Sequence, residues 1–432
     1  MIIWNKEAEC ASRRTMHDLQ SKRLVKLVRT LAAKSLVYKK KLQDQGIKPS
    51  AIKDINDIKK LPFTIKEDLR DGYPFGLFTD FENTAEVHVS SGTTGNPTVV
   101  GYTKEDLKLW SEVMARSLAL AGAVPGDMIQ VAYGYGLFTG GLGAHYGALE
   151  LGLKVLPTSS GQTKRQLKLM NDFKPRVLAC TPSYALFMLD EARALGMDPR
   201  QSSWQIGVFG AEPWSESMRT QIESSWDMRA VDIYGLSEII GPGVANECQH
   251  KRGLHLQWDV FYPEVIDPKT GEEVPEGSRG ELVITTLTKR GIPLLRYRTR
   301  DIVTINYEKC ACGRTTPRIS KILGRTDDML IIRGINVFPS QIEYVLLKIE
   351  GILPHYQLVV DRQNNLDTLE VQVEVDQQMF SDEIKQLRAF ENTVRREIET
   401  VLGIDVAVRL VEPKSIERSE GKAKRVIDKR KI

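Results

Sequence analysis

The chain has 432 residues, which exceeds the usual size of a single hydrophobic core and favours two or three domains. Its apolar share of 41% and charged share of 27% are ordinary for a globular protein and exclude a disordered or fibrous chain. A net charge of +4 does not demand a nucleic-acid partner, and no run approaches the roughly eighteen apolar residues of a membrane span.

The amino-terminal residues and the cysteines indicate the compartment. The first four residues are followed at once by Asn5, Lys6 and Glu7 rather than by the apolar core of a signal peptide. Five cysteines, an odd number, do not resemble a secreted disulfide framework, so thiols or a metal site are expected. We therefore expect a cytoplasmic protein.

Helical and strand patterns alternate from residue 103 onward. Thr103 precedes the acidic Glu105 and Asp106, which predicts a capped helix running to Gly122. The next expected elements are an apolar run at 128–133, a helix to Gly152, a strand at 153–156, a helix from Thr163, a strand at 176–180, a helix after Pro182, and strands at 205–209 and 229–233 around another helix. This alternation predicts an α/β fold with a mostly parallel sheet that binds ligands at its carboxyl edge.

The carboxyl-terminal third has a different pattern of expected elements, with more strands and fewer helices at its start. Strands expected at 281–286 and 301–306 indicate a β-rich subdomain. Beyond it, a small α+β domain is expected, with a strand at 329–333, a helix from Pro339, an alternating strand at 369–375, a long amphipathic helix and a strand at 406–411. No flexible linker is apparent, so residues 324–328 are expected to form a short hinge between domains at 1–326 and 327–432.

A glycine-rich and hydroxyl-rich loop follows the alternating residues 86–89. It reads Ser90, Ser91, Gly92, Thr93, Thr94, Gly95, Asn96 and Pro97. Glycine lets backbone amides approach an anion, and hydroxyl groups donate to phosphate oxygens. A plain polar turn is the alternative interpretation. The loop lacks the Gly-Lys-Ser/Thr ending of the Walker ATPases.

The loop resembles the phosphate-binding signature of the adenylate-forming superfamily, which includes the acyl-CoA synthetases. Further motifs agree with that resemblance in order along the chain. They are 232–238 (DIYGLSE), 297–301 (YRTRD), 324–327 (GRTD) and 421–422 (GK). Finer similarity to the phenylacetate-CoA ligase branch comes from 134–141, 210–214, 296–301 and 329–334. One departure is Asn96, where many relatives carry lysine.

The resemblance implies the nucleotide contacts. The phosphate loop would hold ATP phosphates, Asp301 and Arg325 the ribose, and Tyr234 the adenine, with Glu212 and Pro213 as its other wall and Asp232 and Gly235 in the same motif. Glu238 would bind magnesium, with Thr93 as a second hard oxygen ligand. Without the motif, Glu238 would be a surface glutamate, Asp301 and Arg325 salt-bridge partners, and Tyr234 a core residue.

The resemblance also implies a mobile catalytic lysine near the carboxyl terminus. Lys422 would stabilise charge on the carboxylate and the α-phosphate during adenylation. Lys424 is the nearest rival, and a basic solvated tail is the alternative interpretation of this segment.

The second half reaction implies a rotation of the small domain. Asp327 matches the pivot, and Arg333 and Gly334 match the segment lining the coenzyme A tunnel. Tyr135, Phe138, Gly210 and Ala211 match segments around the aryl group, although an aromatic stripe is more often part of a core.

Cysteine and histidine side chains also predict a metal site. Cys248, His255, Cys310 and Cys312 would supply four ligands to a structural zinc ion, with buried free thiols as the alternative. His255 is preferred over His250 because its longer separation from Cys248 lets the chain turn back.

The combined expectation is an enzyme that makes an acyl-CoA thioester from an arylacetate such as phenylacetate, with ATP, coenzyme A, magnesium and structural zinc. Adenylation of another aryl acid, or transfer to a carrier protein, is the nearest rival. A non-catalytic nucleotide-binding or nucleic-acid-binding protein is the rival from another class. No nucleic acid or membrane partner is expected, and a homodimer is the assembly considered.

Overall fold

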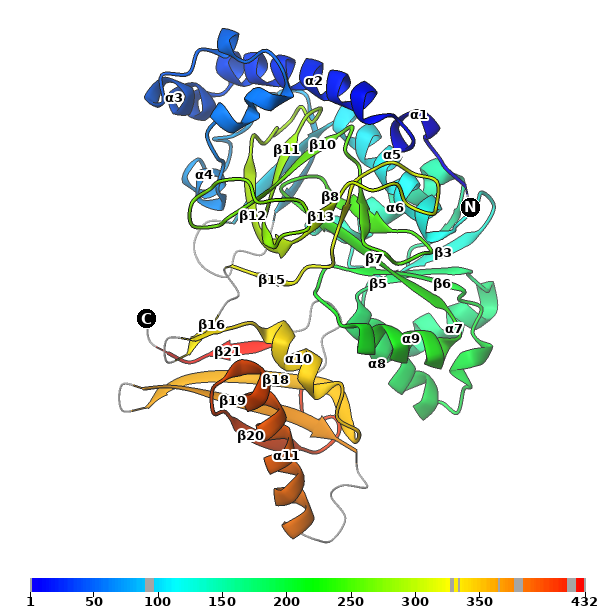
Figure 1. Cartoon of the computed structure of the whole chain (residues 1–432). Helices are drawn as coiled ribbons and strands as arrows, with labels where there is room; N and C mark the ends of the chain where they lie inside the picture. Colours follow the sequence, from blue (N-terminus) through cyan, green and yellow to red (C-terminus); the bar gives the residue numbers. More distant parts are fainter. Residues whose placement is uncertain are drawn as a thin grey trace. The chain divides into compact units, whose positions relative to one another are not determined.

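A computed structural model describes residues 2–89, 97–326, 330–332, 335–363, 366–376, 384–417 and 425–430 (Figure 1). The chain divides into two compact units. The first comprises Met1–Cys180, Ser202–Ala211 and Met228–Ile322, and the second comprises Thr181–Gln201, Glu212–Asp227 and Leu323–Ile432. The domain boundary expected after residue 326 stays a prediction.

The largest sheet of the first unit joins nine strands in the described part of the chain. In spatial order the strands are β13 (Ile305–Asn306), β14 (Arg318–Ile319), β9 (Leu254–Leu256), β8 (Gly241–Glu247), β7 (Arg229–Leu236), β6 (Ile206–Gly210), β5 (Val177–Cys180), β3 (Met128–Val131) and β4 (Lys154–Leu156). Neighbours run parallel from β4 through β3, β5 and β6 to β7, and antiparallel from β7 through β8, β9 and β14 to β13. The expected α/β class is confirmed, and parallel pairing is confined to one half of this sheet.

Helix α5 (Lys104–Ala121) shows why the sequence folds locally as expected. Thr103 accepts the backbone N–H of Asp106, and the Asp106 carboxylate accepts the backbone N–H of Thr103 in return. The helix ends at Gly122, whose φ of 104° suits glycine. Helix α6 (Thr139–Leu151) packs beside α5, and α7 (Thr163–Phe173) follows β4 (Figure 1).

The amino-terminal region is helical, which the sequence analysis did not predict. The apolar face of its longest helix, α2 (Arg13–Lys34), is buried at Met16, Leu24 and Leu31. The elements are α1 (Lys6–Glu9), α2 (Arg13–Lys34), α3 (Leu36–Asp44), η1 (Pro49–Ala51), η2 (Ile55–Lys60) and α4 (Lys66–Asp71).

Two smaller antiparallel sheets complete the first unit. One is the hairpin β1 (Thr84–Val89) and β2 (Val99–Thr103). The other contains β10 (Phe261–Ile266), β11 (Gly280–Thr286) and β12 (Tyr297–Val303). The strand expected at 281–286 is confirmed as β11. The strand expected at 301–306 is divided in two: residues 301–303 end β12, which begins earlier at Tyr297, and Ile305–Asn306 form β13.

The second unit has its own core, which includes Leu358, Val371 and Ile398. Strand β19 (Leu366–Val375) pairs antiparallel with β18 (Ile352–Gln363) and parallel with β20 (Ala407–Val411), and β18 pairs parallel with β21 (Val426–Asp428). The helix from Pro339 and the strand over 369–375 are confirmed, whereas β18 was not predicted. The elements are α8 (Pro182–Ala194), η3 (Pro199–Gln201), α9 (Glu216–Trp226), β15 (Gly324–Arg325), β16 (Leu330–Ile332), β17 (Ile335–Val337), α10 (Pro339–Leu346), β18 (Ile352–Gln363), β19 (Leu366–Val375), α11 (Ile384–Leu402), β20 (Ala407–Val411) and β21 (Val426–Asp428).

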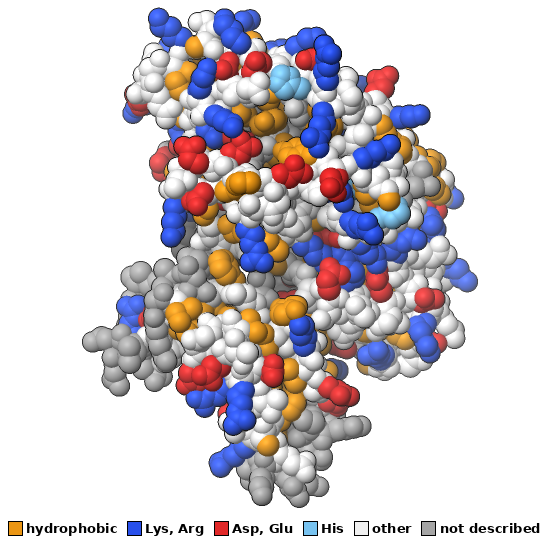
Figure 2. Space-filling view, in the orientation of Figure 1, with side chains coloured by type: hydrophobic (Ala, Val, Ile, Leu, Met, Phe, Trp, Pro, Cys, Tyr) orange, Lys and Arg blue, Asp and Glu red, His pale blue; other side chains and the backbone are white. Residues whose placement is uncertain are grey.

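The surface agrees with the modest net charge. Figure 2 shows basic and acidic side chains both spread over the drawn face. Among the described residues, none of the helices combines the length and the hydropathy needed to span a bilayer.

Candidate functional site

The carboxyl ends of β6 and β7 form the centre of the candidate site. Gly210 ends β6 and pairs with Ile233 on β7. A Cβ atom at Gly210 would lie 2.2 Å from the Ile233 carbonyl oxygen, so close strand packing requires glycine there. Ala211 follows with a φ of 70°, a left-handed conformation that is strained for alanine and is often found at functional sites.

Tyr234 and Asp301 meet although 67 residues separate them in sequence. The Tyr234 hydroxyl donates to Asp301 Oδ2 at 2.6 Å, and the two residues are 8% and 2% exposed. The backbone N–H of Asp301 also donates a hydrogen bond to the Thr299 hydroxyl oxygen at 3.1 Å. Strands β7 and β12 therefore bring two of the sequence motifs together at one buried carboxylate.

Glu238 lies in the turn between β7 and β8 and is 6% exposed. Its Oε1 atom is 3.8 Å from Lys66 Nζ and accepts a long hydrogen bond from the Tyr297 hydroxyl at 3.5 Å. Its backbone carbonyl oxygen accepts a hydrogen bond from the Lys289 ammonium group at 3.0 Å. Burial lowers the pKa of Lys289 to about 8, although the charges of Asp106 and Glu238 oppose that shift.

The segment after β3 carries two of the expected acyl-pocket residues. The Tyr135 hydroxyl lies 3.2 Å from His145 Nδ1, and burial raises the pKa of Tyr135. Phe138 is 50% exposed and precedes α6. Thr139 shares a 3.0 Å hydroxyl hydrogen bond with Ser237, so this segment is tied to the turn that carries Glu238.

Strand β1 leads toward the expected phosphate loop. His88 is buried, and its Nδ1 lies 3.0 Å from the Leu137 carbonyl oxygen. The backbone N–H of Val89 donates to the same carbonyl at 3.3 Å. The loop residues Ser90, Ser91, Gly92, Thr93, Thr94 and Gly95 lie outside the described residues, but β1 ends beside the 134–141 segment.

Several expected site residues lie elsewhere or are not described. Asp232 and Gly235 lie on β7, and the backbone N–H of Asp232 donates to Glu247 Oε2 at 2.9 Å. Glu212 and Pro213 belong to the second unit, where Glu212 accepts the backbone N–H of Ser183 at 2.8 Å, and Arg325 ends β15 there. Asp327, Arg333, Gly334 and Lys422 lie outside the described residues, so their roles stay predictions.

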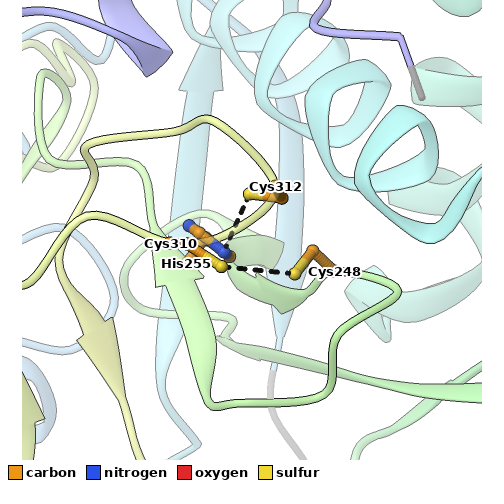
Figure 3. Close-up of side chains that lie close together, drawn as sticks. All are labelled: Cys248, His255, Cys310 and Cys312. Atoms are coloured by element: carbon orange, nitrogen blue, oxygen red, sulfur yellow. Dashed lines mark hydrogen bonds between the residues drawn. The ribbon is translucent and has the colours of Figure 1, made fainter.

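The cysteine and histidine cluster is gathered in the first unit (Figure 3). One ligand atom from each of Cys248, His255, Cys310 and Cys312 lies within 4.8 Å of all the others. The Cys248 and Cys310 sulfurs are 3.8 Å apart, and Cys312 Sγ lies 3.5 Å from His255 Nε2. His255 Nδ1 lies 2.8 Å from the Thr316 hydroxyl, which orients Nε2 toward the thiols.

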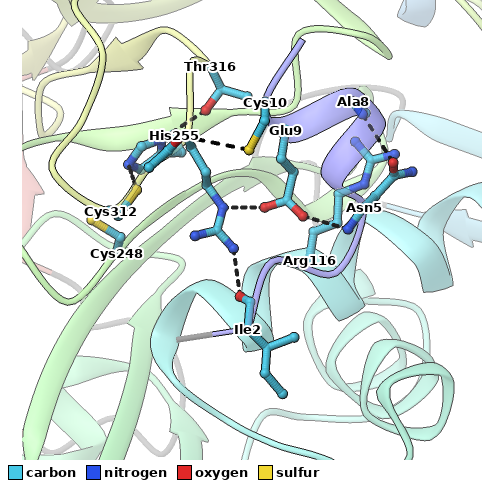
Figure 4. A network of polar contacts seen from close by, with 12 residues as sticks. Ile2, Asn5, Ala8, Glu9, Cys10, Arg116, Cys248, His255, Cys312 and Thr316 are labelled. Carbon is cyan, nitrogen blue, oxygen red and sulfur yellow. Dashed lines mark hydrogen bonds and ion pairs between the residues drawn. The ribbon is translucent and has the colours of Figure 1, made fainter.

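A buried ion pair links this cluster to the amino terminus (Figure 4). The Arg314 guanidinium pairs with Glu9, and it also donates to the Ile2 carbonyl at 2.9 Å. Glu9 accepts the backbone N–H of Asn5 at 2.7 Å, and the Asn5 amide donates to Glu112 at 2.9 Å. The turn after Cys312 thus holds residues that lie about three hundred positions earlier.

Sequence reasoning missed Lys289 and Arg314. Both are basic residues in polar stretches, where exposed side chains are the usual expectation. They are 3% and 0% exposed. The weak available signal for Lys289 was the apolar run that begins at Ile292, between this lysine and the 297–301 motif.

Comparison with known proteins agrees with this arrangement. A family model described as AMP-binding enzyme matches residues 10–288, and a model of the AMP-binding enzyme C-terminal domain matches residues 334–430. These matches define the class of protein as the AMP-binding enzymes.

Curated relatives narrow the class. Phenylacetate-coenzyme A ligase of Thermus thermophilus is 50% identical and is covered over 100% of both chains. The enzyme of the same name from Escherichia coli is 47% identical over 98% of this chain and 97% of its own. A solved structure of 2-hydroxyisobutyryl-CoA ligase in the postadenylation state has a TM-score of 0.92 at 28% identity, covering 98% of this chain and 92% of that one. The chain belongs to the phenylacetate-coenzyme A ligase family.

Proposed function

We propose that the chain catalyses formation of phenylacetyl-CoA from phenylacetate, ATP and coenzyme A. A carboxylate oxygen attacks the α-phosphorus of ATP and releases pyrophosphate, and the coenzyme A thiol then displaces AMP from the acyl carbon. The observation that carries the proposal is the buried hydrogen bond from Tyr234 to Asp301, which joins two family motifs beside the Glu238 turn. Full-length similarity to enzymes named phenylacetate-coenzyme A ligase supports phenylacetate as the acid.

Glu238 fits the proposed magnesium ligand. Its carboxylate is nearly buried, and its described neighbours Lys66 and Tyr297 lie at 3.8 and 3.5 Å, so neither forms a short hydrogen bond with it. A hard carboxylate oxygen is what magnesium prefers, and the ion would neutralise phosphate charge. Thr93 would be the second protein ligand. In this proposal Asp301 binds the ribose hydroxyls, Lys422 acts on the α-phosphate, and Asp327 is the pivot.

A substrate panel tests the proposal. Purified protein is incubated with ATP, magnesium and a series of aryl and aliphatic acids, with and without coenzyme A, and AMP and thioester are quantified. Phenylacetate is expected to give the highest kcat/KM and an equal yield of AMP and thioester. Exchange of ATP with pyrophosphate but no thioester would favour transfer to a carrier protein. A different preferred acid would overturn the substrate assignment alone.

The Tyr234→Phe variant is expected to raise the KM for ATP about tenfold while kcat changes less, because a hydrogen bond to a buried charged group contributes about 1.5–3 kcal/mol. The ring that would stack on adenine is retained. Initial rates at varied ATP measure the effect. Tyr262→Phe on β10 is the matched control and should leave the KM for ATP unchanged. An unaltered KM in Tyr234→Phe would contradict the assigned role of Asp301.

We also propose that the four-residue cluster binds a structural zinc ion. Tetrahedral zinc, with Zn–S bonds of about 2.3 Å and Zn–N bonds of about 2.0 Å, separates two sulfurs by about 3.8 Å and a sulfur from a nitrogen by about 3.5 Å. The observed separations are 3.8 Å between Cys248 and Cys310 and 3.5 Å between Cys312 and His255. Four protein ligands close the coordination shell, which indicates a structural ion rather than a catalytic one.

The purified chain is expected to contain one zinc ion, and Cys310→Ser is expected to lose it. Metal content by mass spectrometry is the measurement. The control is Cys180→Ala, because Cys180 lies on β5 outside the cluster. Chelation should lower the thermal midpoint of the wild type and leave Cys310→Ser unaffected, since a structural ion stabilises only the state that binds it. A wild-type chain with free thiols and no metal would disprove the site.

A further inference from the structure

The turn that carries Glu238 is held by side chains rather than by strand pairing. Residues 237–240 form a turn between β7 and β8, so the carbonyl groups of Ser237 and Glu238 have no partners in the sheet ladder. Buried carbonyl groups need hydrogen-bond donors. The Tyr102 hydroxyl donates to the Ser237 carbonyl at 3.1 Å, and the Lys289 ammonium donates to the Glu238 carbonyl at 3.0 Å.

Lys289 is itself rigidly placed. The Asp106 carboxylate accepts the backbone N–H groups of Arg290 and Gly291 at 2.7 and 2.8 Å, and the Thr79 hydroxyl donates to the Arg290 carbonyl at 2.6 Å. The Lys289 ammonium also lies 4.8 Å from the centre of the Tyr102 ring, a cation–π contact. The loop between β11 and β12 therefore holds the buried Lys289 amine against the backbone carbonyl of Glu238.

A neutral side chain would not replace this lysine. Glu238 and Asp106 are 6% and 1% exposed, and buried carboxylates are costly unless a cation lies nearby. Lys66 approaches the carboxylate end of Glu238 and is 37% exposed at its side chain. Lys289 approaches the backbone end and is buried. The two cations thus contact opposite ends of the same residue, and only the carboxylate end would be contacted by an incoming ion.

We infer that Lys289 is a positioning residue, which fixes the main chain of Glu238 so that its carboxylate is presented to the magnesium of the bound nucleotide. The inference rests on the magnesium role proposed for Glu238. Groups that orient a metal ligand from behind typically change metal affinity or activity about 10–100-fold when they are removed.

The Lys289→Met variant tests this inference, since methionine is of similar length and lacks both the charge and the donor. Calorimetry measures the dissociation constant of ATP with magnesium and again with EDTA, in the absence of any acid. In the wild type, magnesium is expected to tighten ATP binding. In Lys289→Met that tightening should fall about tenfold or more, with ATP affinity in EDTA changed less than about twofold.

Controls separate positioning from general loss of structure. Lys108→Met, at an exposed position of α5, should keep the wild-type magnesium effect. Lys289→Ala should recover part of the effect when ethylammonium is added, and not when sodium is added at equal ionic strength. A wild-type magnesium effect in Lys289→Met, or a loss of ATP binding that is equal with and without magnesium, would overturn the inference. The comparison of the ATP dissociation constants with magnesium and with EDTA needs no acid substrate. It therefore stays informative if phenylacetate is the wrong acid.

Discussion

The Lys422→Ala variant is expected to form the acyl-adenylate about 10²–10³-fold more slowly than the wild type. Adenylation brings a carboxylate and a phosphate together, and the two anions repel until a cation lies between them. The resemblance assigns that cation to Lys422. Because the charge acts mainly in the transition state, kcat should fall while the KM for ATP changes little.

Exchange of labelled pyrophosphate into ATP, driven by phenylacetate, measures this step alone. Lys424→Ala is the matched control, since it removes the same charge two positions away. The account expects the control to retain nearly full activity. The reverse outcome, with Lys424→Ala inactive and Lys422→Ala active, would transfer the role to Lys424.

The Arg314→Met variant is expected to lower the free energy of unfolding by about 3–5 kcal/mol. Arg314 and Glu9 are 0% and 1% exposed and pair with each other. Removing the guanidinium leaves a buried carboxylate without its partner, and it also frees the Ile2 carbonyl. The amino-terminal segment should then separate from the turn that follows Cys312.

Urea unfolding followed by tryptophan fluorescence measures the loss. Lys168→Met is the control, because Lys168 pairs with Asp172 at an exposed position of α7, where such pairs contribute about 0–1 kcal/mol. The double variant Glu9→Gln, Arg314→Met should recover part of the loss, since it no longer buries a lone charge. An Arg314→Met chain as stable as the control variant would show that the pair contributes nothing.

Much of the fold could be predicted where local rules decide the structure. Thr103, Asp106 and Gly122 bound α5 as expected, because capping and the left-handed end of a helix depend on a few adjacent residues. Helix α2 was missed although its buried residues recur at helical spacing from Met16 to Leu31. Polar Gln20 and several basic residues interrupt that apolar stripe, so the periodicity alone is weak.

For the candidate site too, some features could be predicted from the sequence and others only from the structure. Motif resemblance picked out Tyr234, Glu238 and Asp301, but only the structure shows that Tyr234 binds Asp301 across 67 positions. Long-range pairs of this kind depend on sheet topology, which spacing does not encode. Lys289 and Arg314 were not recognised because their importance follows from burial, and the sequence shows only two ordinary basic residues.

Isotope transfer tests the central claim most directly. Phenylacetate labelled with oxygen-18 in its carboxylate is incubated with ATP, magnesium, coenzyme A and the purified chain, and the products are analysed by mass spectrometry. If the carboxylate attacks the α-phosphorus, AMP carries one labelled oxygen, the thioester keeps the other, and pyrophosphate carries none. Unlabelled AMP, or label in the pyrophosphate, would contradict formation of an acyl-adenylate by this chain.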